Sequence, residues 1–310
     1  MTFPRIAFIG TPQSAVPSLA ALTEIGSVQL VVTRPDRPRG RSGQPQPSPV
    51  KAAAGELAIE VYEANRGRDL RPEWFANLDL AVVVAFGVLI PADLLSRPAH
   101  GFINVHFSLL PRWRGASPVT AAIVAGDEET GVTIIRLDAG LDTGPILSAA
   151  PTPIGARETG GALTVRLATI GAELLATTVP DLVSGRIEAV NQPTTGAAYA
   201  PLLTKQDLRF DLDGDPLANS RKVRALAPKP GVRLDVDTGP IRLLAVNPSG
   251  DQVERGRLQI IDDRVWLGCG DGSVELLEVQ PAGRNPMPAS DWARGWRSPP
   301  TVRGAEAGRD

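Results

Sequence analysis

The chain of 310 residues is longer than a typical single domain, so two domains are the default expectation. Its 43% hydrophobic and 21% charged residues are ordinary values for a globular protein and argue against disorder or a fibrous class. The formal net charge of −2 argues against a strongly basic coat for nucleic acid, although separated charges leave room for a local basic patch.

The sequence contains a single cysteine, Cys269, which we expect to be a buried strand residue. One cysteine excludes an intramolecular disulfide and a cysteine-rich metal site, and it fits a reducing compartment. No apolar run approaches the length of about 18 residues that indicates a membrane span. The start MTFPRIAFIG is interrupted too soon, by Gly10 and Pro12, to be a secretory signal. The sequence therefore predicts a cytoplasmic protein.

The first half of the chain alternates apolar runs with helical patterns. The runs are IAFIG, VQLVVT, LAVVVAF, FINVHF and GVTIIRL, and QSAVPSLAALTEIG is one of the helical segments between them. This alternation is typical of a mostly parallel sheet covered on both faces. Leu163, Leu167, Ile170 and Leu174 then share one face of a helix that we expect to close this domain. The opening turn IGTPQSAVP lacks G-x-G-x-x-G, so we expect no dinucleotide cofactor.

The second half has a different pattern. The stretch VNQPTTGAAYAPLLTKQD has no strand or helix signal and predicts a linker. One helical segment, DPLANSRKVRAL, is followed by the short strands VRLDVDT, IRLLAV, LQIID, RVWLG and VELLEVQ, which favour a small barrel or sandwich. We therefore predict an N-terminal domain over residues 1–190, a linker over 191–206 and a C-terminal domain over 207–310.

The stretch NVHFSLLPRWRGASPV places Asn104 and His106 two residues apart in a predicted strand. Side chains two apart in a strand point to the same face. The carboxyl end of a parallel strand opens into the crevice where such sheets bind ligands, so His106 is expected at a site. The alternative is that both are strand-end residues satisfied by the backbone. His100, in SRPAHG, has no such neighbours and is interpreted as a loop residue.

A second polar stretch, RLDAGLDTGP, follows the apolar run GVTII and contains Asp138 and Asp142. Gly140 and Gly144 allow the backbone to turn tightly and present a carboxylate to the neighbouring strand end. A carboxylate near an imidazole raises its basicity and fixes its orientation. The alternative for each aspartate is a turn-forming role only.

Together these groups indicate acyl transfer. An amide can stabilise an oxyanion, a histidine can carry a proton, and an aspartate can orient the histidine. No G-x-S-x-G elbow is present, Cys269 belongs to the other predicted domain, and Ser108 lacks the sharp turn that activates a serine. The nucleophile is therefore predicted to be an amine of the substrate.

Arginines form two further groups. Arg112 and Arg114 flank Trp113, while VVTRPDRPRGRSGQPQPSPVK contains Arg34, Arg37, Arg39, Arg41 and Lys51. Because arginine alternates with proline and glycine there, we expect no helix but a mobile basic loop that contacts phosphate. The alternative is a solvated linker loop. Its position after a strand, on the edge of the sheet that holds the site, favours binding.

The chain resembles the methionyl-tRNA formyltransferases over nearly its whole length. The resemblance rests on FIGTP, TRPDRPRGR with PSPVK, NVHFSLLPRWRGASPV, GDEETGVTIIRLDAGLDTGPIL and NPMPASDWARG. NVH-SLLP with LDTG marks formyltransferases that use 10-formyltetrahydrofolate, whereas RWRGA-P with an extra C-terminal domain points to the tRNA enzymes. The resemblance implies formyl transfer to methionyl initiator tRNA, a Rossmann-like N-terminal catalytic domain and a C-terminal β-barrel that resembles oligonucleotide-binding folds and grips the tRNA.

The resemblance also assigns residues. It implies Asn104, His106 and Asp142 as the catalytic set, with no metal. It implies a folate site formed by Ser108, Leu109, Leu110, Pro111, Phe86, Gly87, Val88, Leu89 and Ile90, and tRNA contacts from Arg37, Arg39, Arg41, Arg112 and Arg114. We expect a monomer without an obligate protein partner or membrane contact. The rival hypotheses are a formyltransferase for a small amine, such as a glycinamide ribotide or an amino sugar nucleotide, and a non-catalytic tRNA- or folate-binding protein.

Overall fold

The computed structural model describes residues 3–38 and 43–304, which form two compact units. Of the described residues, the first unit comprises 3–38, 43–118, 129–153 and 164–200. The second comprises 119–128, 154–163 and 201–304.

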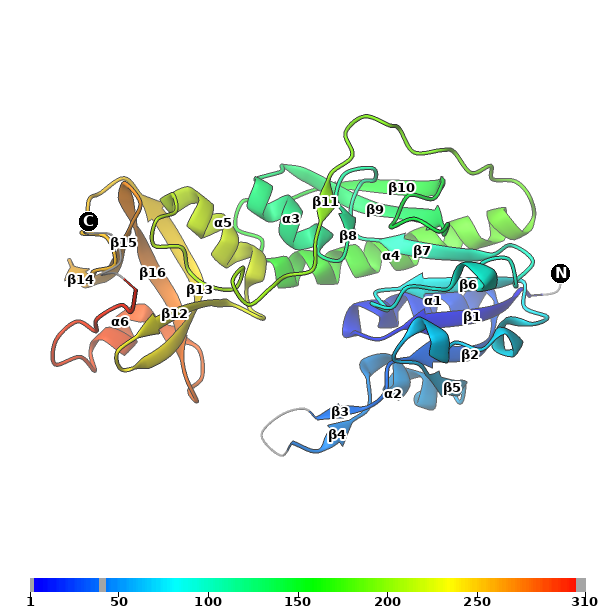
Figure 1. Cartoon of the computed structure of the whole chain (residues 1–310), viewed down its shortest axis with the longest axis horizontal. Coiled ribbons are helices and arrows are strands. Elements are labelled where there is room, and N and C mark those ends of the chain that lie inside the picture. The colour runs from blue at the N-terminus through cyan, green and yellow to red at the C-terminus, as the bar shows by residue number, and fades with distance from the viewer. Residues whose placement is uncertain (1–2, 39–42, 305–310) are drawn as a thin grey trace. The chain divides into compact units, whose positions relative to one another are not determined.

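The first unit is built on a seven-stranded sheet in the order β10-β9-β7-β6-β1-β2-β5 (Figure 1). Its strands are β1 (Arg5–Gly10), β2 (Ser27–Thr33), β5 (Glu60–Glu63), β6 (Leu80–Val84), β7 (Phe102–His106), β9 (Glu129–Arg136) and β10 (Ile146–Pro153). The β1, β2, β5, β6 and β7 strands are parallel, which confirms the predicted mostly parallel sheet. The β9 strand, however, is antiparallel to both of its neighbours. A strand buried on both faces reads as the same apolar run in either direction, so the sequence pattern could not reveal this.

The helices of the chain's first two hundred residues are α1 (Val16–Ile25), α2 (Pro49–Glu56), α3 (Pro118–Ala125) and α4 (Gly160–Val183), with 3₁₀ turns at 13–15, 67–69, 72–75 and 92–94. The α2 helix corrects the expectation that the arginine-rich stretch contains no helix, because the last residues of that stretch begin it. Ser48 caps the helix, its Oγ accepting from the backbone N of Lys51 at 3.0 Å. Proline is excluded from a helix interior but is tolerated in the first turn, where Pro49 lies.

The rest of the arginine-rich stretch forms a short ribbon in which β3 (Arg37–Pro38) pairs with β4 (Pro45–Gln46) (Figure 1). Its base is held to the sheet by ion pairs. Lys51 Nζ lies 2.9 Å from Asp36 and 2.6 Å from Glu63, and Arg34 donates to the side chain of Asn65 at 2.9 Å. These contacts anchor both ends of the predicted loop to the first unit.

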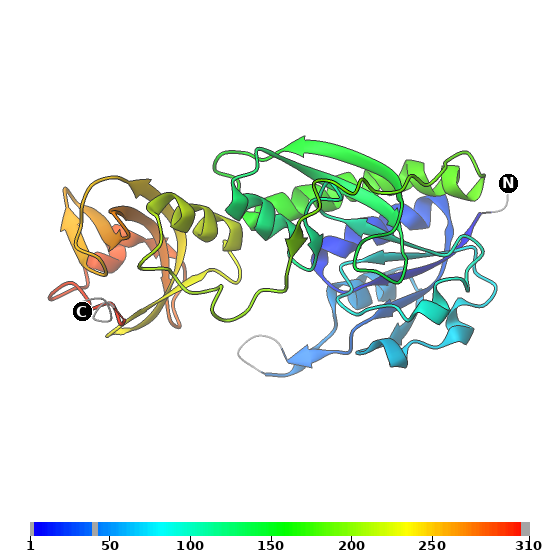
Figure 2. The same cartoon turned by 45° about the horizontal axis from the view of Figure 1, so that its top comes forward.

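The α4 helix confirms the predicted helical pattern and packs along β7 and β9 (Figure 2). Leu163 and Leu167 are fully buried, whereas Ile170 and Leu174 are half-buried. A Cβ at Gly171 would lie 2.8 Å from Val105 Cγ1, so glycine allows the close approach. Among the described residues α4 alone is long and apolar enough to cross a membrane, with 44% of its apolar window buried inside the fold.

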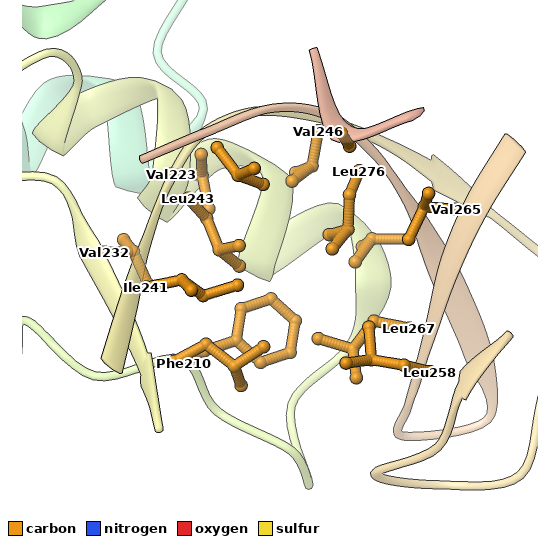
Figure 3. Close-up of a cluster of buried hydrophobic side chains, with 14 of the residues drawn as sticks. Phe210, Val223, Val232, Ile241, Leu243, Val246, Leu258, Val265, Leu267 and Leu276 are labelled. Atoms are coloured by element: carbon orange, nitrogen blue, oxygen red, sulfur yellow. The ribbon is translucent and has the colours of Figure 1, made fainter. Parts of the chain in front are cut away.

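The second unit contains an antiparallel sheet in the order β12-β13-β16-β15-β14, with β17 paired to β16. Its elements are α5 (Pro216–Leu226), β12 (Val232–Val236), β13 (Gly239–Ser249), β14 (Leu258–Ile261), β15 (Arg264–Cys269), β16 (Gly272–Pro281), β17 (Met287–Pro288) and α6 (Ala289–Ala293). All five predicted strands and the predicted helix are present. The core cluster in Figure 3 includes Phe210, Val223, Leu243 and Leu267. Cys269 is fully buried at the end of β15, as predicted, and burial raises the pKa of its thiol to about 11.

Candidate active site

Asn104 and His106 lie at the carboxyl end of β7, inside the sheet. The β7 strand pairs with β6 on one side and β9 on the other, with Asn104 in register with Val83 and Ile135. His106 has 5% of its side chain exposed and Asn104 is half-buried. Because they are two residues apart, both side chains project to one face, as predicted, while Val105 is buried on the other.

Asp142 joins these two side chains from the loop between β9 and β10. Its Oδ1 accepts from Asn104 Nδ2 at 3.2 Å, and its Oδ2 lies 3.7 Å from His106 Nδ1. The second oxygen also accepts from the backbone N of Gly115 at 2.9 Å. The structure therefore brings the three predicted catalytic side chains together.

The route by which Asp142 reaches the site differs from the expectation. Since β9 is antiparallel to β7, it ends beside the start of β7, where Leu137 N donates to Phe102 O at 2.8 Å. The loop then folds back toward Asn104. A Cβ at Gly144 would lie 1.8 Å from Arg136 O, so only glycine permits this return.

The second aspartate, Asp138, has a turn-forming role. It accepts from Gly140 N at 3.0 Å and from Thr143 Oγ1 at 2.8 Å. The sequence left each aspartate either a role in the site or a role in the turn. The structure gives Asp138 the turn and places Asp142 in the site.

The tautomer of His106 follows from its backbone partner. Its Nε2 lies 2.9 Å from the carbonyl oxygen of Trp113, which can only accept, so Nε2 carries the proton. Burial lowers the pKa of His106, against the opposing effects of the Asp142 charge and the Trp113 carbonyl. The neutral ring therefore presents an unprotonated Nδ1 that can accept a proton.

Two buried hydroxyl groups hold the loop that carries the Trp113 carbonyl. Ser108 Oγ donates to Arg112 O at 2.6 Å. Thr133 Oγ1, on β9, donates to Ser108 O at 2.7 Å and accepts from Leu110 N at 3.1 Å. The Ser108 hydroxyl is engaged with the backbone, in line with the prediction that it is not a nucleophile. Sequence reasoning missed Thr133, which sits inside an apolar run.

Backbone strain is concentrated around the same side chains. Of the seven described non-glycine residues with positive φ, Trp113 and Asp142 belong to the site and Ala85 directly follows β6, the strand beside β7, with φ of 65°, 51° and 48°. Such conformations cost of order 1–3 kcal/mol each and persist where the surrounding structure imposes them. Their grouping here supports a functional role for the site.

The loop after β6, predicted to contact folate, alternates between core and surface. Phe86 is buried, and Val88 and Ile90 pack against the same core cluster. Gly87 is exposed, and 76% of Leu89 is exposed. In the other predicted folate segment Leu110 is buried while Leu109 and Pro111 are half-buried.

The predicted arginines have different environments. The Arg112 guanidinium lies 4.4 Å from the centre of the Trp113 ring. Arg37 is exposed on β3, with its guanidinium 3.4 Å from Asn65 Oδ1. Arg39 and Arg41 lie outside the described residues. Arg114 is half-buried and engaged with a residue that the sequence did not single out.

That residue is Gln192, in the stretch predicted as a linker. Its Oε1 accepts from Arg114 Nε at 3.0 Å and from the terminal nitrogen at 2.7 Å. Its Nε2 donates to the carbonyl oxygens of Asp142 and Gly144, both at 2.8 Å. Gln192 thus connects Arg114 with the loop that carries Asp142. A lone glutamine in a proline-containing stretch gives no sequence signal for such a role.

Neighbouring residues continue this connection. Val190 exchanges two backbone hydrogen bonds with Ile146, and β11 (Tyr199–Ala200) pairs with β8 (Arg114–Gly115). We call residues 190–200 the strap.

Within the described part of the chain no group of three or more metal-ligating side chains occurs.

Comparison with known proteins places this geometry in a family. A formyl transferase family model matches residues 4–179, and a model of the formyl transferase C-terminal domain matches residues 202–297. The methionyl-tRNA formyltransferases of Acidothermus cellulolyticus and Halorhodospira halophila are each 42% identical to this chain, covering 96% of it and 99% and 97% of their own lengths.

Solved structures show the same fold at lower identity. An N-formyltransferase from Helicobacter canadensis, in complex with folinic acid and dTDP-3-aminofucose, has a TM-score of 0.66 at 16% identity and covers 91% of this chain and 100% of its own. HypX from Aquifex aeolicus, in complex with tetrahydrofolic acid, has a TM-score of 0.64 at 17% identity and covers 95% of this chain and 47% of its own. Given the two family models and the identity over nearly the full length, the chain belongs to the methionyl-tRNA formyltransferase family.

Proposed function

We propose that Asn104, His106 and Asp142 carry the family's reaction in this chain. That reaction transfers the formyl group of 10-formyltetrahydrofolate to the α-amino group of methionyl initiator tRNA. The observation that supports this assignment is the position of the Asp142 carboxylate, which holds the Asn104 amide with one oxygen and faces His106 Nδ1 with the other.

The chemistry of each group follows from its hydrogen bonds. An asparagine amide has two N–H groups, and the bond to Asp142 uses one, so the second can donate to the oxyanion that forms when the amine attacks the formyl carbon. His106 Nδ1 takes the proton that the amine loses, and the resulting imidazolium is stabilised by Asp142. The same proton then passes to the departing folate nitrogen.

The segments assigned to folate suit a flat, partly apolar substrate. Phe86, Val88 and Ile90 anchor their loop in the core, which leaves the backbone of Gly87 and the side chain of Leu89 exposed at the carboxyl edge of the sheet. Leu109, Leu110 and Pro111 are proposed to complete this surface. Ser108 would act through loop shape, because its hydroxyl is already engaged with Arg112 O.

The tRNA contacts are proposed from charge and position. The ribbon formed by β3 and β4 carries Arg37 and is anchored at its base by Lys51, so it can present a basic edge to phosphate. Arg112, stacked on Trp113, is proposed as a second basic contact. We assign Arg39, Arg41 and Arg114 to the same role, with Arg114 acting in part through Gln192.

The domain roles complete the proposal. Residues 1–190 form the catalytic domain and 191–206 the linker, and residues 207–310 form a barrel that resembles oligonucleotide-binding folds and holds tRNA. The antiparallel strands of the second unit support this proposal, in which β12 and β14, the two ends of the strand order, would approach each other to close the barrel. The protein is proposed to act in the cytoplasm as a monomer without membrane contact.

The decisive experiment mixes purified protein and 10-formyltetrahydrofolate with charged initiator methionyl-tRNA, charged elongator methionyl-tRNA or free methionine, in separate reactions. Formyl-methionine formed only with the initiator tRNA would support the reaction, the substrate and the selection together. If no reaction forms product while folate still binds, the proposed acceptor is wrong and the search for the acceptor moves to small amines. A steep fall in affinity with salt would separate tRNA recognition from small-amine recognition.

A further inference from the structure

The second unit contains a pocket that the proposed chemistry does not use. It has a volume of about 350 Å³ and lies between three segments, which are the turn joining β12 to β13, the connection from β16 to β17, and α6 with the residues after it. This volume is near the lower end of the range for small-molecule sites, roughly 300–1,000 Å³, so it suits one nucleotide-sized group.

One wall of the pocket is aromatic and firmly supported. Trp292 and Trp296 meet edge to face, with ring centres 4.8 Å apart and planes at 89°. Both rings, with Met287, are half-buried and pack against the hydrophobic core of the unit. Since their other sides line the pocket, they offer a fixed apolar surface that costs little ordering on binding.

Trp296, whose ring contributes to this wall, has a hydrogen-bond donor without a partner. Trp296 Nε1 is buried and makes no hydrogen bond to any residue that the structure describes. An indole N–H can only donate, and buried donors in native proteins almost always have an acceptor. Because this N–H is closed to solvent in the structure, a carbonyl or ring-nitrogen acceptor of a ligand would reach it after a small movement of the indole.

The pocket also has a free positive charge at its edge. Arg284 is exposed and lines the pocket, and its guanidinium makes no hydrogen bond or ion pair to the residues in the described ranges. Asp291, the carboxylate of the pocket, is by contrast paired with Arg294. The uncompensated charge therefore favours an anionic group next to the aromatic wall.

We propose that this pocket binds one unpaired nucleobase of the tRNA substrate. The base stacks on the tryptophan wall, a base acceptor takes the Trp296 N–H, and the adjoining phosphate pairs with Arg284. Aromatic stacking beside arginine is how proteins hold unstacked bases of RNA, whereas a paired stem presents no free base face. This inference rests on the proposed function, because it requires tRNA as the partner.

The test uses the full-length protein and fluorescein-labelled initiator tRNA, with binding followed by anisotropy. Trp296→Phe keeps one aromatic ring but removes the N–H together with part of the stacking surface of the indole, and it is expected to raise Kd at least roughly threefold to tenfold, the range for one lost hydrogen bond. Arg284→Ala is expected to raise Kd and to lower the slope of log Kd against log salt by about one. Trp266→Phe and Arg264→Ala, on β15 and outside the pocket lining, are the matched controls and should bind as wild type.

Melting temperatures of all four variants show whether each protein is folded. Unchanged Kd and salt slope in both pocket variants would overturn the inference, as would equal losses in the controls. The formylation assay on wild type is read separately. If wild type binds tRNA through the pocket but does not formylate it, the proposed function fails and the pocket stands.

Discussion

Replacing Gln192 by alanine tests whether the strap positions the active site. The side chain accepts two hydrogen bonds from the Arg114 guanidinium and donates two to the carbonyls of Asp142 and Gly144. A neutral hydrogen bond contributes about 0.5–1.5 kcal/mol net and one to a charged group about 1.5–3 kcal/mol. Water can replace part of this network because Gln192 is half-buried.

We therefore expect a loss of about 2–3 kcal/mol in transition-state stabilisation, which is a fall of roughly 30- to 150-fold in kcat/KM. Most of the loss should appear in kcat, since Asp142 shifts relative to Asn104 and His106 while the segments proposed to bind folate stay in place. Gln192→Glu should restore little, because it keeps the acceptor for Arg114 but places a carboxylate against two carbonyl oxygens.

The assay is steady-state formylation with the KM of tRNA and of folate measured separately, together with the melting temperature. Asn191→Ala is the control, since this neighbour is exposed and makes no hydrogen bond to the residues described. If Gln192→Ala is within twofold of wild type while it remains folded, the strap does not position Asp142 and the reasoning is wrong.

Three further predictions concern Asn104, His106 and Thr133. Asn104→Ala should lower kcat by about 10²–10³, the range for a lost oxyanion donor, with folate binding by calorimetry nearly retained; an equal loss of folate affinity would make Asn104 a binding residue. Burial lowers the pKa of His106 below its ordinary value of 6.5, so below pH 6.5 the unfolded chain binds a proton that the folded chain does not bind. The free energy of unfolding should therefore decrease as pH falls from 6.5 toward the folded pKa. The titration of His106 by NMR with labelled histidine, assigned with His106→Asn, checks this, and a midpoint at or above 6.5 would contradict it. Thr133→Val should remove the partners of Ser108 O and Leu110 N and so lower kcat more than either KM, with a shifted pH–rate profile; Thr133→Ser, which keeps the hydroxyl, should recover most of the activity, and failure to do so would point to packing instead.

Most strands of both units were predictable because buried strands appear in the sequence as apolar runs. The exceptions have physical causes. The β5 strand reads EVYE and has no buried residue, and β10 contains Pro151 and Pro153, which occur in sheets almost only at edges. Both are the edge strands of the sheet. Edge strands carry the weakest apolar pattern, so a search for apolar runs passes over them.

The proposed catalytic side chains were predictable for a different reason. Asn104 and His106 share a face by strand geometry alone, and the glycines around Asp142 permit the loop that carries it. Thr133 and Gln192 could not be found in this way, because each acts by bonding to backbone groups far away in sequence. A side chain that bonds to backbone leaves no complementary residue type in the sequence to search for.

The position of the Asp142 carboxylate depends on segments outside the loop between β9 and β10. One oxygen is held by β7 through Asn104, and the other by Gly115 N, on the strand that pairs with the strap. A Cβ at Gly115 would lie 2.6 Å from Ala200 O, so the close contact between these segments requires glycine. The strap begins at residue 190, the predicted end of the catalytic domain, and its later residues Gln192 and Ala200 both contact the segments that fix Asp142. A catalytic fragment that ends at 190 would therefore retain all three proposed catalytic side chains and lose the contacts that align them.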